Sequence, residues 1–241
     1  MAGLVATTLI NLNDHRGARG WFHTAQRAAE ESEDRALCAW VMVRHAVSAL
    51  YWDDPYTAQE LATEAAVTAG CLPCVAAAWA PAVQARACAR MGAAHAEEAR
   101  AALGRAEEAY STIETQPGER YAYGYTGAQL HFYRSSALTE LGETAAAYEA
   151  QAAALALYEP GAFLDPCLVR LDRAVCLAKD GDTEEAAHSV CQFLITLPRE
   201  HASPVVLHRA RRFATYMSRA HYGLAAVREL RRVLALEAGP A

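Results

Sequence analysis

The sequence predicts an all-α protein: a right-handed superhelix, or α-solenoid, of about five to six antiparallel helix pairs in one domain spanning residues 1–241. The chain is 53% hydrophobic but only 8% aromatic, and it is rich in alanine, the strongest helix former. Strand-like alternation of Val, Ile and Thr is nearly absent. A pattern of small residues recurs about every 40 residues, which indicates stacked repeats.

Small residues at fixed distances from five turns define the repeat. The turns are Asn13, Asp53, Ala94, Gly142 and Gly181. Seven residues before the turns lie Ala6, Ala46, Ala87, Ser135 and Ala174; five after them lie Ala18, Ala58, Ala99, Ala147 and Ala186; twelve after them lie Ala25, Ala65, Ala106, Ala154 and Phe193. The two positions after each turn share one helix face. Small side chains there let neighbouring helices approach closely.

Turn and cap signals place the first three pairs. The first pair begins with MAGLVATTLI. The second pair turns at Asp53, and Asp54 before Pro55 predicts the N-cap of its second helix. The third pair turns at Ala94, although Gly92 is a competing turn residue.

Longer connections separate the last pairs. Residues 111–127, STIETQPGERYAYGYTG, predict a linker and a candidate flexible point before the fourth pair. Asp165 and Ser203, each followed by proline, predict the N-caps of later helices. Residues 203–236 are expected to form C-terminal capping helices, with a degenerate sixth pair turning near Ala220.

The small-residue pattern is similar to that of tetratricopeptide repeats (TPRs), with a longer period than their usual ~34 residues. Four segments resemble the C-terminal TPR region of actinobacterial regulators: GARGWFHTAQRAAEESEDRALCAWVMVRHAVSALYWDDPYTAQELATEA, RSSALTELGETAAAYEAQAAALALY, DPCLVRLDRAVCLAKDGD and LPREHASPVVLHRAR. Those regulators usually carry an N-terminal helix-turn-helix of the xenobiotic-response type. The resemblance implies a role in differentiation or secondary metabolism. Because the first repeat begins within ten residues of Met1, we expect this chain to lack the DNA-binding domain.

Charge and cysteine content narrow the function classes. The net charge is −6, yet residues 199–234 carry eight arginines against two glutamates. The acidity of the rest argues against direct nucleic-acid binding. The seven irregularly spaced cysteines indicate reduced thiols and a cytoplasmic protein. We also expect no membrane segment, no cofactor and no metal, since the CLPC pair at Cys71 and Cys74 lacks a second pair of ligands.

The concave face of the first helix of each pair is the expected binding surface. It is predicted to include Val43, Val47, Gln84, Cys88, Phe132, Ser136, Leu171 and Val175, with Trp40 and Gln129 at its mouth. His131 lies in the aromatic cluster RYAYGYTGAQLHFYR. This mixed lining suits a peptide, a protein segment or a small metabolite.

A basic row is a second candidate. His45, Arg86, Arg134 and Arg173 stand eight residues before successive turns. Guanidinium groups in one row can bind a carboxylate or phosphate. Alternatively, each pairs locally with an acid or lies between helices.

The leading functional hypothesis is a non-catalytic scaffold, because we find no phosphate loop, HExxH motif or nucleophile elbow. An enzyme or accessory protein of natural-product biosynthesis is the alternative, with Tyr123, His131, Arg134 and Asp172 as acid–base candidates. A homodimer in which the partner fills the groove is a third possibility.

Overall fold

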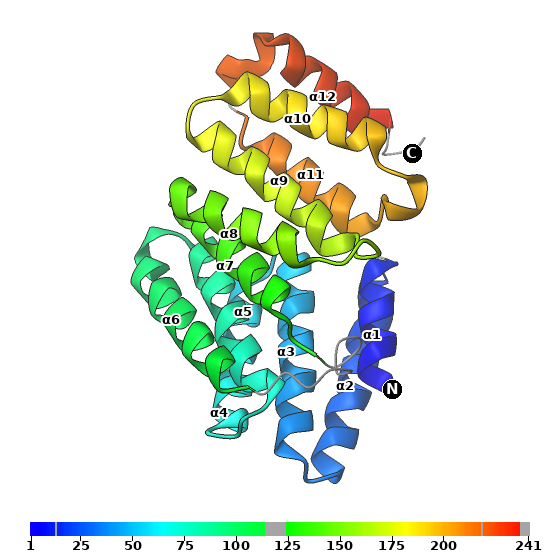
Figure 1. Cartoon of the computed structure of the whole chain (residues 1–241). Helices are drawn as coiled ribbons and strands as arrows, with labels where there is room; N and C mark the ends of the chain where they lie inside the picture. The colour runs from blue at the N-terminus through cyan, green and yellow to red at the C-terminus, as the bar shows by residue number, and fades with distance from the viewer. Residues whose placement is uncertain (13, 114–123, 218, 237–241) are drawn as a thin grey trace.

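The computed structural model describes residues 1–12, 14–113, 124–217 and 219–236, and within these it contains helices and no strand (Figure 1). The all-α prediction is confirmed. Most of the predicted flexible point at 111–127, including Tyr121 and Tyr123, lies outside the described residues.

The described α-helices follow one another as sequential pairs. The pairs are α1 (Ala2–Asn11) with α2 (His15–Glu31), α3 (Arg35–Tyr51) with α4 (Pro55–Ala69), α5 (Val75–Met91) with α6 (Ala96–Thr112), α7 (Gly127–Leu141) with α8 (Thr144–Leu157), α9 (Leu164–Lys179) with α10 (Thr183–Thr196), and α11 (Pro204–Thr215) with α12 (Ala225–Leu236). Three 3-10 helices lie in connections: η1 (Ala93–His95), η2 (Arg199–His201) and η3 (Arg219–Gly223). Each first helix also packs on the first helix of the next pair, from α1 and α3 through to α9 and α11. The arrangement is that of a repeat-like helical array.

Short polar side chains start several helices as the sequence predicts. The Asp54 carboxylate accepts a hydrogen bond from the Thr57 amide at 3.0 Å, and the Ser203 hydroxyl accepts one from Val206 at 3.4 Å. Each bond satisfies a backbone donor that the first helical turn leaves without a partner. Asp165 is different. Helix α9 starts at Leu164, two residues before the start that an N-cap at Asp165 predicts. Asp165 therefore lies in the first turn, and the predicted N-cap is wrong.

Of the five predicted turns, three are confirmed, one is wrong, and one, Asn13, lies outside the described residues. Asp53, Gly142 and Gly181 all have positive φ, and each is followed two residues later by the second helix of its pair. In the third pair, Gly92 has the positive φ, while Ala94 lies in η1. Helix α6 therefore begins four residues after the turn glycine. This two-residue insertion shifts the register of α5, so Gln84 rather than Arg86 stands eight residues before the turn.

The small-residue positions form the contacts between helices. All fourteen small members of the three columns are at most 6% exposed, and the bulky Phe193 is half-buried. Alanine at these sites removes side-chain volume between backbones, which sets how closely successive helices pack.

An alanine-to-leucine pair of variants on α6 tests this role of alanine. Ala99 is fully buried, whereas Ala101, on the same helix, is exposed. Because leucine is nearly as good a helix former as alanine, helix propensity is matched between the two sites. Ala99→Leu should lower the free energy of unfolding by about 1–3 kcal/mol through overpacking, and Ala101→Leu should change it by less than about 0.5 kcal/mol. Urea unfolding measures both, and equal costs would contradict the account.

The inner face of the first helices is covered rather than open. The eight residues expected to line a concave groove, from Val43 to Val175, are all buried. Helix α11 explains part of this, because it packs on α9 and also touches α1 (Figure 1). The last pair thus returns to the beginning of the chain, and space for a ligand remains only where the helices do not meet.

Buried ion pairs hold α11 in this position. Arg209 donates to the Asp172 carboxylate, with the Nε contact at 2.9 Å, and lies 3.6 Å from Glu140. Arg212 lies 2.9 Å from Glu140, and the Tyr216 hydroxyl donates to the same carboxylate at 2.9 Å. Burial alone would raise the pKa of Glu140, but Arg209 and Arg212 hold that pKa below its usual value. The C-terminal capping helices are therefore attached to the array through the carboxylate partners of Arg209 and Arg212.

Within the described residues, none of the helices combines the length and apolar character needed to cross a bilayer.

Candidate functional site

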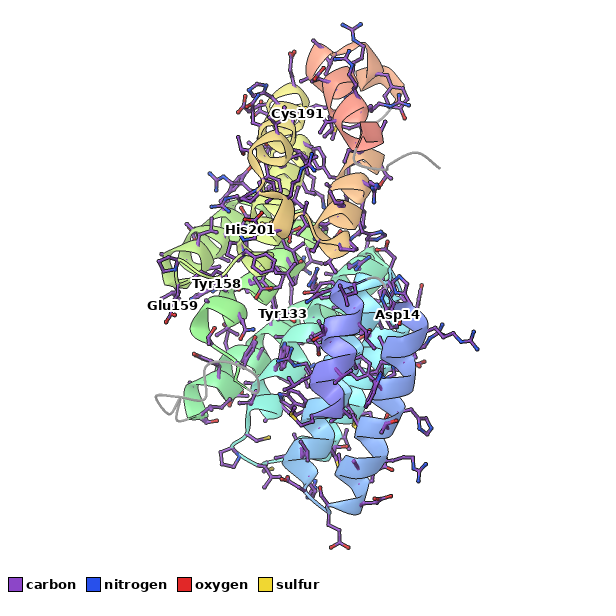
Figure 2. All side chains as sticks on the ribbon, turned by 90° about the vertical axis from the view of Figure 1, so that its right-hand side faces the viewer. Asp14, Tyr133, Tyr158, Glu159, Cys191 and His201 are labelled. Atoms are coloured by element: carbon purple, nitrogen blue, oxygen red, sulfur yellow. The ribbon has the colours of Figure 1, made fainter. Side chains whose placement is uncertain are left out.

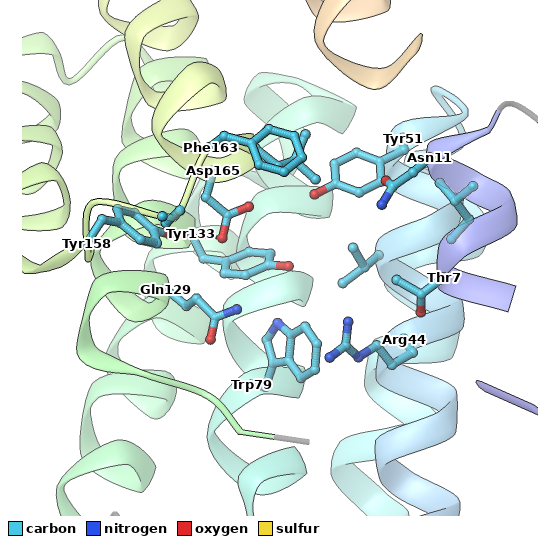
Figure 3. Close-up of a pocket in the computed structure, with 15 residues that line it drawn as sticks. Thr7, Asn11, Arg44, Tyr51, Trp79, Gln129, Tyr133, Tyr158, Phe163 and Asp165 are labelled. Atoms are coloured by element: carbon cyan, nitrogen blue, oxygen red, sulfur yellow. Dashed lines mark hydrogen bonds between the residues drawn. The ribbon is translucent and has the colours of Figure 1, made fainter. Parts of the chain in front are cut away.

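A cavity of about 330 Å³ lies on the inner face, between α1, α3, α5, α7 and the connector that leads from α8 into α9 (Figure 3). Two of its tyrosines, Tyr133 and Tyr158, lie near the middle of the molecule (Figure 2). Its lining consists of Thr7, Ile10, Asn11, Arg44, Val47, Tyr51, Trp79, Gln129, Tyr133, Tyr158, Gly161, Ala162, Phe163, Leu164 and Asp165. The volume is at the lower end of the range for small-molecule sites.

A carboxylate occupies one wall. The side chain of Asp165 accepts a hydrogen bond from the Tyr158 hydroxyl at 2.9 Å. Burial raises the pKa of Asp165, while the Tyr158 bond and the nearby Arg86 and Arg44 favour the charged form. Asp165 lies in the first turn of α9 rather than at the N-cap position, and its carboxyl group lines the cavity.

A guanidinium occupies the opposite wall. The Arg44 guanidinium lies 4.9 Å from the ring centroid of Trp40 and 4.7 Å from that of Trp79. Both distances are within the range of cation–π attraction, which fixes the side chain while preserving its charge. Figure 3 shows Arg44 and Asp165 on different sides of the cavity, with the rings of Tyr133 and Trp79 between them.

Aromatic rings form the surface between the two charges. Trp79 stacks on Tyr125 with ring centroids 5.8 Å apart and meets Tyr133 edge-on at 6.3 Å. Burial raises the pKa of Tyr51 to about 12 and raises that of Tyr133 further. Both hydroxyls therefore stay protonated at neutral pH and offer hydrogen bonds without charge.

Two of the predicted site residues belong to this cavity or support it. Gln129 lines it, and its side-chain oxygen also accepts a hydrogen bond from the Thr126 amide at 3.0 Å. Trp40 is buried beside Arg44. Val43 and Phe132 lie in the core around the cavity without lining it.

The basic row is not assembled. His45 stacks on Phe22 at 4.8 Å. Arg134 pairs with Glu107 at 3.3 Å, and Arg173 lies over the Tyr148 ring at 4.9 Å. In each case the partner is on the second helix of the preceding pair. Local pairing with an acid is observed for Arg134, whereas His45 and Arg173 contact aromatic rings.

The remaining predicted residues lie apart from one another. Gln84 hydrogen-bonds Thr63 on α4 at 3.1 Å. Arg86 is buried on the inner side of α5 because of the register shift. His131 is half-buried. Its pKa is lowered mainly by burial and also by the positive charge of Arg134.

The acid–base set expected for an enzyme is not brought together in the described structure. Asp172 is fully buried and paired with Arg209, away from the cavity. Tyr123 is not among the described residues.

Sequence reasoning missed Arg44, Tyr158 and Asp165. Arg44 precedes His45 and therefore lies one residue outside the row of basic residues that stand eight before each turn. Tyr158 and Asp165 flank the segment EPGAFL between α8 and α9. An aromatic residue and an acid on either side of such an inter-pair segment are the signal that points to them.

The array and its cavity define a class of protein: helix pairs packed in series around a small amphipathic site. No protein-family model and no curated protein matched the chain. Among the described side chains, no cluster of three His, Cys, Asp or Glu residues could hold a metal ion, and the seven cysteines are free thiols.

Proposed function

We propose that the protein is a non-catalytic recognition scaffold that binds a small dipolar molecule, carrying an amine and an acid group, in the cavity between Arg44 and Asp165. The observation that carries the proposal is the pair of opposite charges on different walls of one cavity, separated by aromatic rings. A free amino acid, a short peptide or a related metabolite has this chemistry.

Each pole of such a ligand has a suitable partner. An ammonium group donates to the Asp165 carboxylate, which Tyr158 already orients, and charge-assisted bonds are about twice as strong as neutral ones. A carboxylate lies against Arg44, whose planar group is stacked between two indoles. The apolar part of the ligand contacts Trp79 and Tyr133.

Regulation is the proposed context. A ligand-sensing helical array agrees with the resemblance to the TPR region of actinobacterial regulators, and we extend the proposal to control of differentiation or secondary metabolism. A protein partner would then bind preferentially to the ligand-bound form. Homodimer formation stays a prediction.

A catalytic function is the second candidate, and one observation favours it. Asp165 has a raised pKa and is hydrogen-bonded to Tyr158 inside the cavity, and perturbed groups in clefts are candidates for acid–base chemistry. A biosynthetic role on natural products would use this pair.

A melting-temperature screen tests the proposal. The purified chain is heated with each free amino acid and simple dipeptide, and with N-acetyl and amide derivatives of the same compounds. At least one free compound should raise the melting temperature, and blocking either its amine or its acid should abolish the rise, because one charged pole is lost. Failure of all free compounds would contradict the proposal. Mass spectrometry of each incubated mixture gives a direct readout of catalysis, since a new product would support the enzyme alternative.

A further inference from the structure

Four arginines line a second, smaller void that lies next to the ligand cavity. A small void with room for about one water-sized sphere, about 10 Å³, is lined by residues of α3, α5, α9 and α11 and the turn after α3. Its lining consists of Leu50, Tyr51, Asp53, Arg86, Arg90, Leu168, Val205, His208, Arg209 and Arg212. Tyr51 lines both this void and the ligand cavity.

Arg86 is the unusual member of the set. It is only 2% exposed, and its Nε and Nη1 atoms have no hydrogen-bond partner in the described part of the chain. Its guanidinium lies 5.2 Å from the ring centroid of Phe132 and between 5 and 6 Å from those of Tyr51 and Tyr133. Aromatic faces attract the cation but do not accept the in-plane N–H groups as a carboxylate or an anion would.

The neighbouring arginines already have acidic partners. Arg90 pairs with Asp53, Arg212 with Glu140, and Arg209 with Asp172. With Arg86, four guanidiniums line the void, and three of them have a carboxylate partner. The carboxyl group of Asp165, in the ligand cavity, acts on Arg86 electrostatically, but no hydrogen bond joins it to the Nε and Nη1 atoms of Arg86 in the described part of the chain. His208 also contacts Asp53 and adds no negative charge.

The electrostatics of Arg90 reflect this group of guanidiniums. Burial first, and then the nearby Arg212, Arg86 and Arg209, lower the pKa of Arg90 to about 10, although Asp53 opposes the shift. A buried polar group without a partner is costly, and an unobserved ion is one of the few ways in which a folded protein satisfies it.

We propose that this void binds a single monatomic anion of the halide class, chloride in the cell, with Arg86 as its principal ligand. The size of the void suits one small ion better than the larger phosphate, sulfate or a carboxylate-bearing ligand. The anion accepts the N–H groups that Arg86 leaves without partners. The site stabilises the junction of α5 with α11 and does not require the ligand proposed for the cavity.

Anion-dependent melting of the full chain tests this site. The melting temperature is measured in sodium chloride and in sodium gluconate at the same ionic strength, so that general screening is constant. Chloride at about ten times its Kd should raise the melting temperature by about 3–6 °C relative to gluconate. Bromide should act similarly, and sulfate should give no more than gluconate.

Two variants assign the effect to the site. Arg86→Met should abolish the difference between chloride and gluconate. Arg27→Met should retain it, because Arg27 is exposed on α2, where it pairs with Glu31 of the same helix. Equal melting in the two salts, a chloride effect that survives Arg86→Met, or a selective effect of sulfate would overturn the proposal.

Crystallography in bromide keeps the proposal testable if Arg86→Met does not fold. The anomalous difference map of the unmodified protein should show a bromide peak in hydrogen-bonding contact with the Arg86 guanidinium. A map with no peak at Arg86 would overturn the proposal.

Discussion

Replacing Arg209 with methionine is expected to lower the free energy of unfolding by about 3–5 kcal/mol. Arg209 is 8% exposed and is the partner of Asp172, which is fully buried. Methionine fills much of the same space but leaves the Asp172 carboxylate in the interior without a counter-charge. The attachment of α11 to α9 should loosen as a result. Urea unfolding followed by circular dichroism measures the loss.

Two further variants separate this charge effect from a general loss of an arginine. Arg232→Met removes an exposed arginine that pairs with Glu229 on the same helix and should cost no more than about 1 kcal/mol. The double variant Arg209→Met, Asp172→Leu removes both buried charges and should recover a large part of the stability. A loss below 1 kcal/mol for Arg209→Met, or no recovery in the double variant, would show that the ion pair does not hold the last helix pair in place.

Replacing Asp165 with asparagine is expected to weaken ligand binding by about 10- to 100-fold, because a charge-assisted hydrogen bond contributes about 1.5–3 kcal/mol. The same change should make the ligand-free protein more stable at neutral pH. Burial raises the pKa of Asp165 in the folded state, so the carboxyl group favours folding when protonated and disfavours it when ionised. Titration calorimetry with the best compound from the melting screen measures the affinity.

The sign of the stability change depends on pH. Below the ordinary aspartate pKa of about 3.9, Asp165 is protonated in both the folded and the unfolded chain, and the raised pKa has no effect. As the pH rises through that value towards the folded-state pKa, the unfolded chain releases its proton first and the wild type loses stability relative to the variant. The melting temperature of Asp165→Asn should therefore rise relative to that of the wild type across this window, and the difference should become constant above the folded-state pKa. Glu108→Gln, on the exposed face of α6, should change neither affinity nor this pH dependence.

The fold could be predicted because its signals are local. Small residues at fixed distances from a turn determine how closely two helices pack, and a turn residue with positive φ such as Gly142 or Asp53 is visible from residue type. The third pair shows the limit. The spacing to Ala99 and Ala106 points to Ala94 as the turn, whereas the residue with the left-handed backbone is Gly92. The two differ because, with η1 in the connection, α6 begins four residues after its turn residue, two more than in the pairs that turn at Asp53 and Gly142.

The candidate site could be predicted only in part because it depends on contacts between distant segments. The positions of Gln129 and Trp40 on their helices predict that both lie near the inner face, where the cavity is found. The covering of the inner face by α11 requires Arg209 to meet Asp172, 37 residues earlier, and no local pattern indicates that pairing. Asp165 was assigned to a helix cap because an acid before proline usually caps, and only the observed start of α9 places it in the cavity.

A crystal structure of the protein with the strongest free amino acid or dipeptide from the melting screen tests the central claim most directly. We expect the ligand in the inner cavity, with its amine within hydrogen-bonding distance of the Asp165 carboxylate and its acid group against Arg44. A ligand bound elsewhere on the molecule, or bound in the cavity with neither charged group contacting these two side chains, would contradict the account.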